Sequence, residues 1–288
     1  MASLILPPSV KSAADLLSDF DKLMEESMRP IPTGIKELDR VLNGGVRDIL
    51  VTLVGKGGSG KTMLAINLAR AIAQQRQLLY LSFEMTPRML LTRFISSCSA
   101  RGGLEEAIAE AELYPTARTE DQERRLAAAK RSFSEIAHNV LIIDQTTALD
   151  THSKPFTIDS LRSMVARARK ETGVAPAVFI GYVQQFIEGA DQRTTTTDHL
   201  DHLARHLAAM AHGEETPVIA ISSAAKDGSI RGSSHLAHAA DVILSLELEG
   251  PCAPESPSTL LGRIEKNRCG SAGDSVEMRC LPSCHFIW

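Results

Sequence analysis

The segment Gly55-Lys56-Gly57-Gly58-Ser59-Gly60-Lys61-Thr62 fits the pattern G-x-x-x-x-G-K-[ST] of a phosphate-binding loop. Glycines in such a loop allow successive backbone N–H groups to surround phosphate groups without clashes from Cβ atoms. An apolar run precedes the segment and a helical stretch follows it, so the positive end of that helix points at the same phosphates. In this pattern Lys61 reaches the β- and γ-phosphates, and the Thr62 hydroxyl is a ligand of Mg²⁺. The segment therefore predicts a site for a nucleoside triphosphate and Mg²⁺.

Short, nearly all-apolar runs alternate with helical stretches around this segment, from residue 35 onward. Such runs are typical of central strands in a parallel sheet that is covered on both faces. The alternation predicts an α/β fold with a doubly wound, mainly parallel sheet. The expected strands are 49–54, 78–82, 140–144, 177–180, 218–222 and 242–246. The expected helices are 61–75, 86–100, 104–137, 157–172 and 198–212, and 260–265 with 275–280 should form a hairpin at the sheet edge.

An amphipathic helix is expected before this domain, over residues 12–28. Its apolar stripe comprises Leu16, Leu17, Phe20 and Met24, and its opposite face is acidic. The proline-rich segment 29–34 is typical of a linker. We therefore expect an N-terminal segment over 1–30 and one domain over 31–288. The stripe has to be covered either by the helix's own domain or by a neighbouring subunit.

The composition excludes several classes of protein. The 288 residues carry 31 Lys and Arg against 35 Asp and Glu, a net charge of −4, which excludes a uniformly basic nucleic-acid-binding protein but not a local basic patch. No run of 18 apolar residues is present, so no membrane-spanning helix is expected. The first residues lack the features of a signal peptide. Five scattered cysteines favour reduced thiols, and hence a cytoplasmic protein.

Acidic residues at strand ends are the candidates for metal binding and for activating water. Glu84 follows the run 78–82, and Asp144 ends the run 140–144, whereas the run 177–180 is followed by Gly181. Spacing alone assigns Asp144 to the metal and Glu84 to the base. Either could instead be a solvated strand-end acid.

Further segments, in order along the chain, resemble the helicase domain of DnaB-type replicative helicases, over residues of about 31–288. They are Thr33-Gly34-Ile35 with Leu38-Asp39 and Gly44-Gly45, Leu81-Ser82-Phe83-Glu84-Met85-Thr86, Ile158-Asp159-Ser160-Leu161-Arg162, Gly181-Tyr182-Val183-Gln184, Pro217-Val218-Ile219-Ala220-Ile221-Ser222, Ile230-Arg231-Gly232-Ser233 through Ala240-Asp241-Val242-Ile243, and Lys266-Asn267-Arg268-Cys269-Gly270. Together these motifs are specific. Apart from the phosphate-binding loop, each alone is weak.

The resemblance implies a RecA-like ATPase core in a six-membered ring, with ATP between subunits. Lys61 and Thr62 would bind ATP from one side, and Glu84 would be the catalytic glutamate. Lys266 and Arg268 would reach the γ-phosphate from the neighbouring subunit, where a cation stabilises charge on the transferring phosphoryl group. The helix at 12–28 would then pack on the next subunit. The family's separate N-terminal domain is not seen in this sequence.

Two positions depart from the family pattern. Gly181 stands where the family has its magnesium-binding aspartate, and Ser223 stands where it has a glutamine that senses the γ-phosphate. Three interpretations stay open. Hydrolysis is weak, with Thr62 and water holding Mg²⁺; another acid such as Asp144 substitutes; or ATP acts as a structural switch without turnover.

Loops after the later strands line the central channel of such rings. Here these loops cover about 186–200 and 223–236, and their candidate nucleic-acid-binding residues are Arg193, Lys226 and Arg231. Small, hydroxyl-rich and sparsely basic loops suit contacts with phosphates that do not depend on base sequence. The alternative is that these are ordinary surface loops.

The leading hypothesis is an ATP-dependent helicase or translocase that acts as a ring on single-stranded DNA. The first alternative is an ATP-binding switch, or an assembly or loading protein, that has kept the fold and lost turnover. The second is a RecA-like recombination or repair ATPase. The resemblance also makes a separate loader or primase a candidate partner.

Overall fold

A computed structural model describes residues 12–21, 29–114, 117–144, 156–186, 196–225, 230, 234–249 and 256–288. Within these residues, one sheet of nine strands has the order β3-β2-β4-β5-β1-β6-β7-β8-β9. Strands β1 to β6 pair in parallel, and β7 to β9 extend the sheet in antiparallel fashion. The strands are β1 (Leu50–Gly55), β2 (Leu78–Ser82), β3 (Val140–Asp144), β4 (Ala177–Gly181), β5 (Val218–Ser223), β6 (Val242–Glu249), β7 (Ser258–Asn267), β8 (Ser275–Leu281) and β9 (Phe286–Ile287). The expected α/β fold, with its six parallel strands and C-terminal hairpin, is confirmed.

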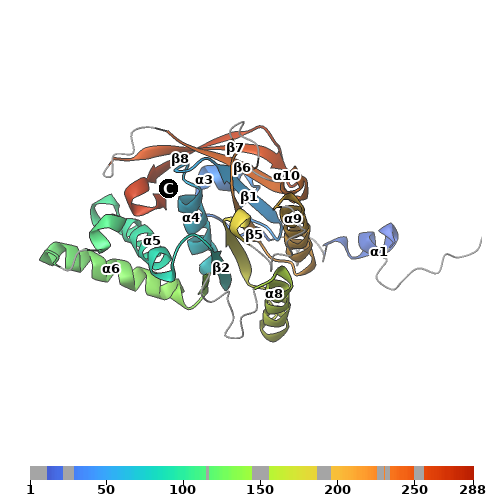
Figure 1. Cartoon of the computed structure of the whole chain (residues 1–288), viewed down its shortest axis with the longest axis horizontal. Helices are drawn as coiled ribbons and strands as arrows, with labels where there is room; N and C mark the ends of the chain where they lie inside the picture. The colour runs from blue at the N-terminus through green and yellow to red at the C-terminus, as the bar shows by residue number, and fades with distance from the viewer. Residues whose placement is uncertain are drawn as a thin grey trace, which may run out of the picture.

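Helices cover both faces of the sheet, because the inner strands are apolar on both sides (Figure 1). One core cluster packs α3, α4, α5 and α6 against the sheet, and the other packs α8, α9 and α10. Their bounds are α3 (Lys36–Val41), α4 (Lys61–Ala73), α5 (Pro87–Ser99), α6 (Glu120–Ala137), α8 (Ile158–Thr172), α9 (Thr196–Gly213) and α10 (Ser234–Ala239). All six residues of β1 are buried, so the strand before the phosphate-binding loop is held from both faces.

The single helix expected over 104–137 is wrong. The chain instead makes three short 3₁₀ turns, Ala100–Gly102, Leu104–Glu106 and Glu110–Leu113, before α6 begins. Ala107 and Ala109 take extended backbone conformations, with ψ of 134° and 146°, and these break the helical path. Thr119 then caps α6 by accepting a hydrogen bond from the Gln122 backbone N–H.

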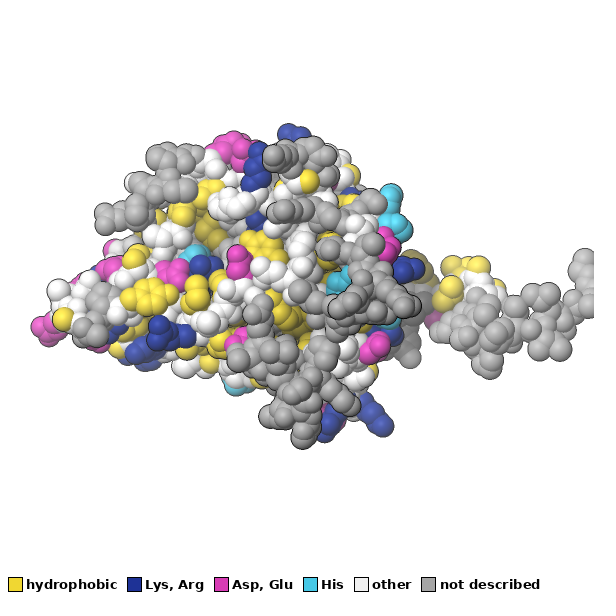
Figure 2. Space-filling view, viewed as in Figure 1, with side chains coloured by type: hydrophobic (Ala, Val, Ile, Leu, Met, Phe, Trp, Pro, Cys, Tyr) yellow, Lys and Arg dark blue, Asp and Glu magenta, His cyan; other side chains and the backbone are white. Residues whose placement is uncertain are grey.

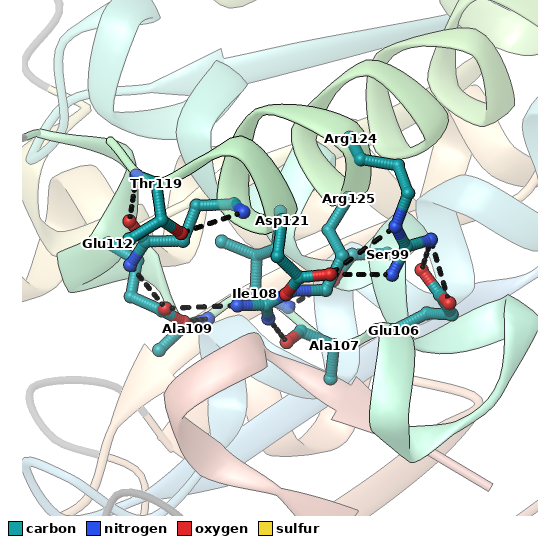
Figure 3. A network of polar contacts seen from close by, with 11 residues as sticks. Ser99, Glu106, Ala107, Ile108, Ala109, Glu112, Thr119, Asp121, Arg124 and Arg125 are labelled. Carbon is teal, nitrogen blue, oxygen red and sulfur yellow. Dashed lines mark hydrogen bonds and ion pairs between the residues drawn. The ribbon is translucent and has the colours of Figure 1, made fainter. Parts of the chain in front are cut away.

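Acidic residues of this region are anchored by arginines of α6 (Figure 3). Arg124 pairs with Glu106 at 2.8 Å and with Asp121 at 2.9 Å. Arg125 pairs with Asp121 at 2.9 Å and donates to the carbonyl of Ala107 at 2.7 Å. The turns after α5 are therefore fixed against α6. Glu110, in the last of these turns, pairs with His285, which lines the cavity beside the phosphate-binding loop.

The N-terminal helix is described only in part. Helix α1 spans Ala13–Ser18, and residues 22–28, including Met24, lie outside the described residues. No residue of α1 is buried, and hydrophobic side chains show on its surface (Figure 2). Leu16, Leu17 and Phe20 are exposed by 43%, 73% and 53%. Its own chain therefore leaves this part of the apolar stripe uncovered.

None of the described helices combines the length and apolarity needed to cross a bilayer. The described cysteines, Cys98, Cys269, Cys280 and Cys284, are all free thiols.

Candidate nucleotide site

The predicted phosphate-binding loop joins β1 to α4, and its backbone requires glycine. Gly60 is the N-cap of α4 and has a φ of 85°, a conformation that side chains disfavour. A Cβ atom on Gly60 would lie 2.7 Å from Cδ1 of Leu260, and one on Gly55 would lie 2.2 Å from Oγ of Ser59. The loop therefore curls tightly between the strand and the helix. The N–H groups of the first turn of α4 have no acceptor within the helix itself and can meet an anion.

Lys61 is buried at the start of α4, and its ammonium is held at the loop. Its Nζ donates to the carbonyl oxygens of Gly55 at 2.9 Å and Lys56 at 2.6 Å. Burial lowers the pKa of Lys61, and the Glu84 carboxylate opposes that effect. If a phosphate binds in the loop, this ammonium is in place to donate to phosphate oxygens instead of the loop carbonyls.

The loop opens into a cavity of about 370 Å³. Its lining includes the loop itself, the segment after β2, one side of α5, and the chain just before β9. The lining residues are Gly58, Ser59, Gly60, Lys61, Thr62, Met63, Glu84, Met85, Met89, Arg93, Tyr182, Leu248, Pro282 and His285. Glu84 is the only carboxylate among these described residues, and it lies in the same cavity as Thr62.

Tyr182 links the end of β4 to the loop. Its hydroxyl interacts with the side chain of Thr62, and its ring centroid lies 5.4 Å from Nζ of Lys61. Burial raises the pKa of Tyr182 and the Glu84 charge raises it further, so the hydroxyl keeps its proton. Two residues on, Gln184 donates to Oγ of Ser222 at 2.7 Å, and its side-chain oxygen accepts from the Ser223 backbone at 3.5 Å. The polar groups at the ends of β4 and β5 are thus bound to one another.

Gly181 is buried at the end of β4, between Ser82 of β2 and Ile221 of β5. It offers no side chain to a metal or to metal-bound water. A Cβ atom there would lie 2.9 Å from Cδ1 of Ile221, the end of a flexible side chain. The strand end therefore has room for a side chain only after Ile221 shifts.

Asp144 cannot replace the missing acid in the same subunit. It ends β3, the edge strand, and β2, β4 and β5 separate β3 from β1. Four strand spacings put it about 19 Å from the strand that carries the loop. The assignment of Asp144 to the metal, made from spacing alone, is therefore wrong, and the alternative that it substitutes for the acid fails with it.

Lys266 and Arg268 lie at the amino ends of the parallel strands, whereas the loop lies at their carboxyl ends. The Arg268 backbone N–H donates to the carbonyl of Asp241, whose own N–H donates to Leu50, the first residue of β1. The loop follows Gly55, the last residue of β1. The strand between them is about 16 Å long at 3.3 Å per residue. Neither cation lines the cavity of its own subunit.

Arg193, Lys226 and Arg231, the predicted nucleic-acid-binding residues, lie outside the described residues.

Sequence reasoning missed three residues near the cavity: Arg93, His285 and Glu110. Glu110, from the turns after α5, pairs with His285 Nε2 at 2.7 Å and with Arg93 at 3.3 Å. Burial alone would raise the pKa of Glu110, but the hydrogen bond from His285 and the charge of Arg93 lower it to about 2. Arg93 could have been found, because it is a cation on α5, the helix that begins three residues after Glu84. His285 depends on long-range packing and had no local signal.

A family model described as the DnaB-like helicase C terminal domain matches residues 30–284. The curated relatives include the replicative DNA helicase DnaB of Nostoc sp. (strain PCC 7120 / SAG 25.82 / UTEX 2576), 28% identical over 220 residues, and that of Rickettsia typhi (strain ATCC VR-144 / Wilmington), 26% identical over 234 residues. These matches cover 74% and 76% of this chain but 23% and 43% of the relatives. The chain thus spans less than half the length of these two helicases.

Solved structures show the same fold. One of them, an ATPase domain, superposes with a TM-score of 0.75 at 19% identity, covering 94% of this chain and 96% of that one. A DnaB-like replicative helicase, whose structure was described with its interactions with primase, gives a TM-score of 0.77 at 20% identity and covers 96% of this chain and 68% of that one. The expected RecA-like architecture is confirmed.

Proposed function

Because the chain belongs to the DnaB-like helicase C-terminal domain family, we propose that it is an ATPase motor that forms a ring and moves along single-stranded DNA. The family assignment favours this function over a recombination or repair ATPase. The ring is expected to be hexameric and to act in the cytoplasm.

The observation that carries the proposal is the position of two groups that a nucleotide would need: the phosphate-binding loop lies at the carboxyl ends of the parallel strands, and Arg268 lies at their amino ends. The phosphate-binding loop follows the last residue of β1, and Arg268 lies beside its first residue. A subunit cannot bring both to one nucleotide. Head-to-tail association would bring the amino ends of the strands of one subunit to the carboxyl ends of those of the next. Such contacts form a ring when the rotation between subunits closes, and a filament when it does not. Each interface would then complete one ATP site.

The residues present suit ATP with Mg²⁺. Mg²⁺ is usually bound through one or two carboxylates together with substrate phosphates and several waters. Here the Thr62 hydroxyl would be the protein ligand, and phosphates and waters would complete the shell. When bound there, Mg²⁺ would supply positive charge that neutralises the phosphates. The N–H groups of the loop and Lys61 would grip these phosphates, and Glu84 would orient the attacking water and accept its proton. Lys266 and Arg268 of the neighbour would stabilise charge on the γ-phosphoryl group.

A second candidate, an ATP-binding switch, is favoured by Gly181 and Ser223. Gly181 supplies no carboxylate behind the metal-bound water, and only the backbone N–H of Ser223 meets Gln184. One change removes a group that acts on Mg²⁺ and the other a group that senses the γ-phosphate, and both therefore favour ATP binding without turnover. Glu84 is the residue that favours slow hydrolysis instead.

Phosphate release with and without single-stranded DNA, measured for wild type and K61A, tests the proposal. Turnover that DNA stimulates and K61A abolishes supports the motor. ATP binding with no turnover supports the switch instead. Strand displacement on a forked duplex then separates a helicase from a translocase. K130A is the control, because Lys130 is an exposed lysine of α6 that does not line the cavity.

Three features outside the catalytic centre complete the proposal. Arg193, Lys226 and Arg231 would contact DNA phosphates in the channel. The stripe of α1, left uncovered by its own chain, would pack on the next subunit. A separate loader or primase would be a partner, since the DnaB-like replicative helicase of similar fold interacts with primase.

A further inference from the structure

The carboxylate of Asp241 binds donors from three elements that are distant in sequence. It accepts hydrogen bonds from the backbone N–H of Leu50 at 3.0 Å, from Nε2 of His212 at 2.8 Å, and from Nη1 of Arg268 at 2.9 Å. Its side chain is only 4% exposed. Asp241 thus joins the start of β1, the end of α9 and the residue after β7 through one buried group.

This carboxylate stays charged. Burial alone would raise the pKa of Asp241, but the Leu50 N–H and the hydrogen bonds from Arg268 and His212 lower it. A buried carboxylate is tolerated only when its partners hold their geometry. Asp241 is therefore a fixed negative point at the amino edge of the sheet.

Arg268 is anchored at one side and open at the other. A guanidinium has five N–H donors in a rigid fork. Nη1 donates to Asp241, and Nη2 donates to the carbonyl of His238 at 3.1 Å. About half of the side chain, 51%, stays exposed. Its remaining donors can meet an anion without breaking the contact with Asp241.

Lys266, like Arg268, is held by the end of α10. Its Nζ donates to the last carbonyls of α10, those of Ala237 at 2.9 Å and His238 at 2.8 Å. Burial and the charge of Arg268 lower the pKa of Lys266. The two cations are thus close together and share the carbonyl of His238.

We propose that Asp241 is the positioning residue for Arg268, and that it holds the guanidinium outward for the ATP bound by the neighbouring copy. This inference rests on the proposed function. A cation that is oriented before the interface closes loses less freedom on meeting a phosphate and stabilises the developing charge better. His212 occupies the other carboxylate oxygen and fixes the plane of the carboxylate.

The test combines D241N and R268A as single and double variants. Phosphate release in the presence of single-stranded DNA gives kcat and KM, calorimetry gives ATP affinity, and urea unfolding gives stability. D48N is the control, because Asp48 pairs with Arg76 at 3.2 Å just before β1 but touches neither cation. D241N is expected to lower kcat about ten- to a hundredfold with ATP affinity unchanged, since small displacements of a catalytic group have costs of that order. In the R268A background it should add no further loss, because the two residues act as one unit.

The proposal would be overturned if the losses of kcat caused by D241N and R268A multiplied in the double variant. It would also be overturned if D241N lowered kcat no more than D48N does. Where D241N does not fold, D241E keeps the charge and moves it by one methylene group. Wild-type kcat in D241E would then contradict positioning by Asp241, and reduced kcat with normal ATP binding would support it. Failure of the proposed function is seen separately, in a wild-type protein that binds ATP and releases no phosphate, and it would remove this inference too.

Discussion

Tyr182 and Thr62 interact through their side chains at the carboxyl ends of the parallel strands, so the residue after Gly181 reaches the predicted Mg²⁺ ligand. The same Tyr182 ring lies 5.4 Å from Nζ of Lys61. The end of β4 is therefore part of the nucleotide site even though Gly181 itself contributes no side chain.

Glu84→Gln should separate binding from turnover. Glutamine keeps the size of the side chain but cannot accept a proton, so phosphate release should fall by about 10²–10⁴-fold, the usual contribution of a general base. ATP affinity by calorimetry should be unchanged, because the loop and Lys61 do the binding. Glu37→Gln is the control, since Glu37 lies on α3 and pairs with Arg40, away from the cavity. Wild-type turnover in Glu84→Gln would remove Glu84 from the chemistry.

Gly181→Asp should increase turnover. The new carboxylate would follow β4 directly before Tyr182, and the Cδ1 atom of Ile221, 2.9 Å from the added Cβ, can rotate away. We expect Mg²⁺-dependent phosphate release to rise on the order of tenfold, equivalent to about 1.4 kcal/mol of barrier. Gly181→Asn has the same size without the charge and should not show this rise. Equal rates for the Asp and Asn variants would mean that the missing acid does not limit turnover.

The parallel strands were predictable because each is an apolar run between turn residues, and the loop was predictable because few residue types can surround phosphates. The break before α6 was not recognised, because acidic residues such as Glu106 and Glu112 fit a solvated helix face as well as they fit ion pairs with Arg124 and Arg125. The two short helices α3 and α10 and the two-residue β9 have too few residues to show a period. Residues that reach the site from afar, such as His285 and Glu110, depend on packing that no local pattern encodes. The assignment of Asp144 to the metal was wrong for a related reason. The order of the strands in the sheet decides which strand ends are neighbours, and no local pattern encodes that order.

Glu110 should make stability depend on pH in the acid range. Its pKa is lowered to about 2 in the folded chain from its usual value of 4.5, so the stabilisation is present above 4.5 and is lost as the pH falls toward 2. Urea midpoints measured across this range should fall less steeply in Glu110→Gln than in wild type, because glutamine does not titrate. Parallel curves for the two proteins would show that the contacts of Glu110 with His285 and Arg93 do not stabilise the fold.

The most direct test of a nucleotide site shared between subunits is to mix two inactive variants, Lys61→Ala and Arg268→Ala, and to measure phosphate release with single-stranded DNA. An Arg268→Ala subunit keeps its loop and a Lys61→Ala subunit keeps its arginine, so about a quarter of the interfaces in a randomly mixed ring would be intact. The account predicts that the mixture regains turnover that neither variant has alone, and that replacing the Lys61→Ala partner with the double variant abolishes the gain. A mixture as inactive as its components, with both variants assembled together, would contradict a site completed by the neighbouring subunit.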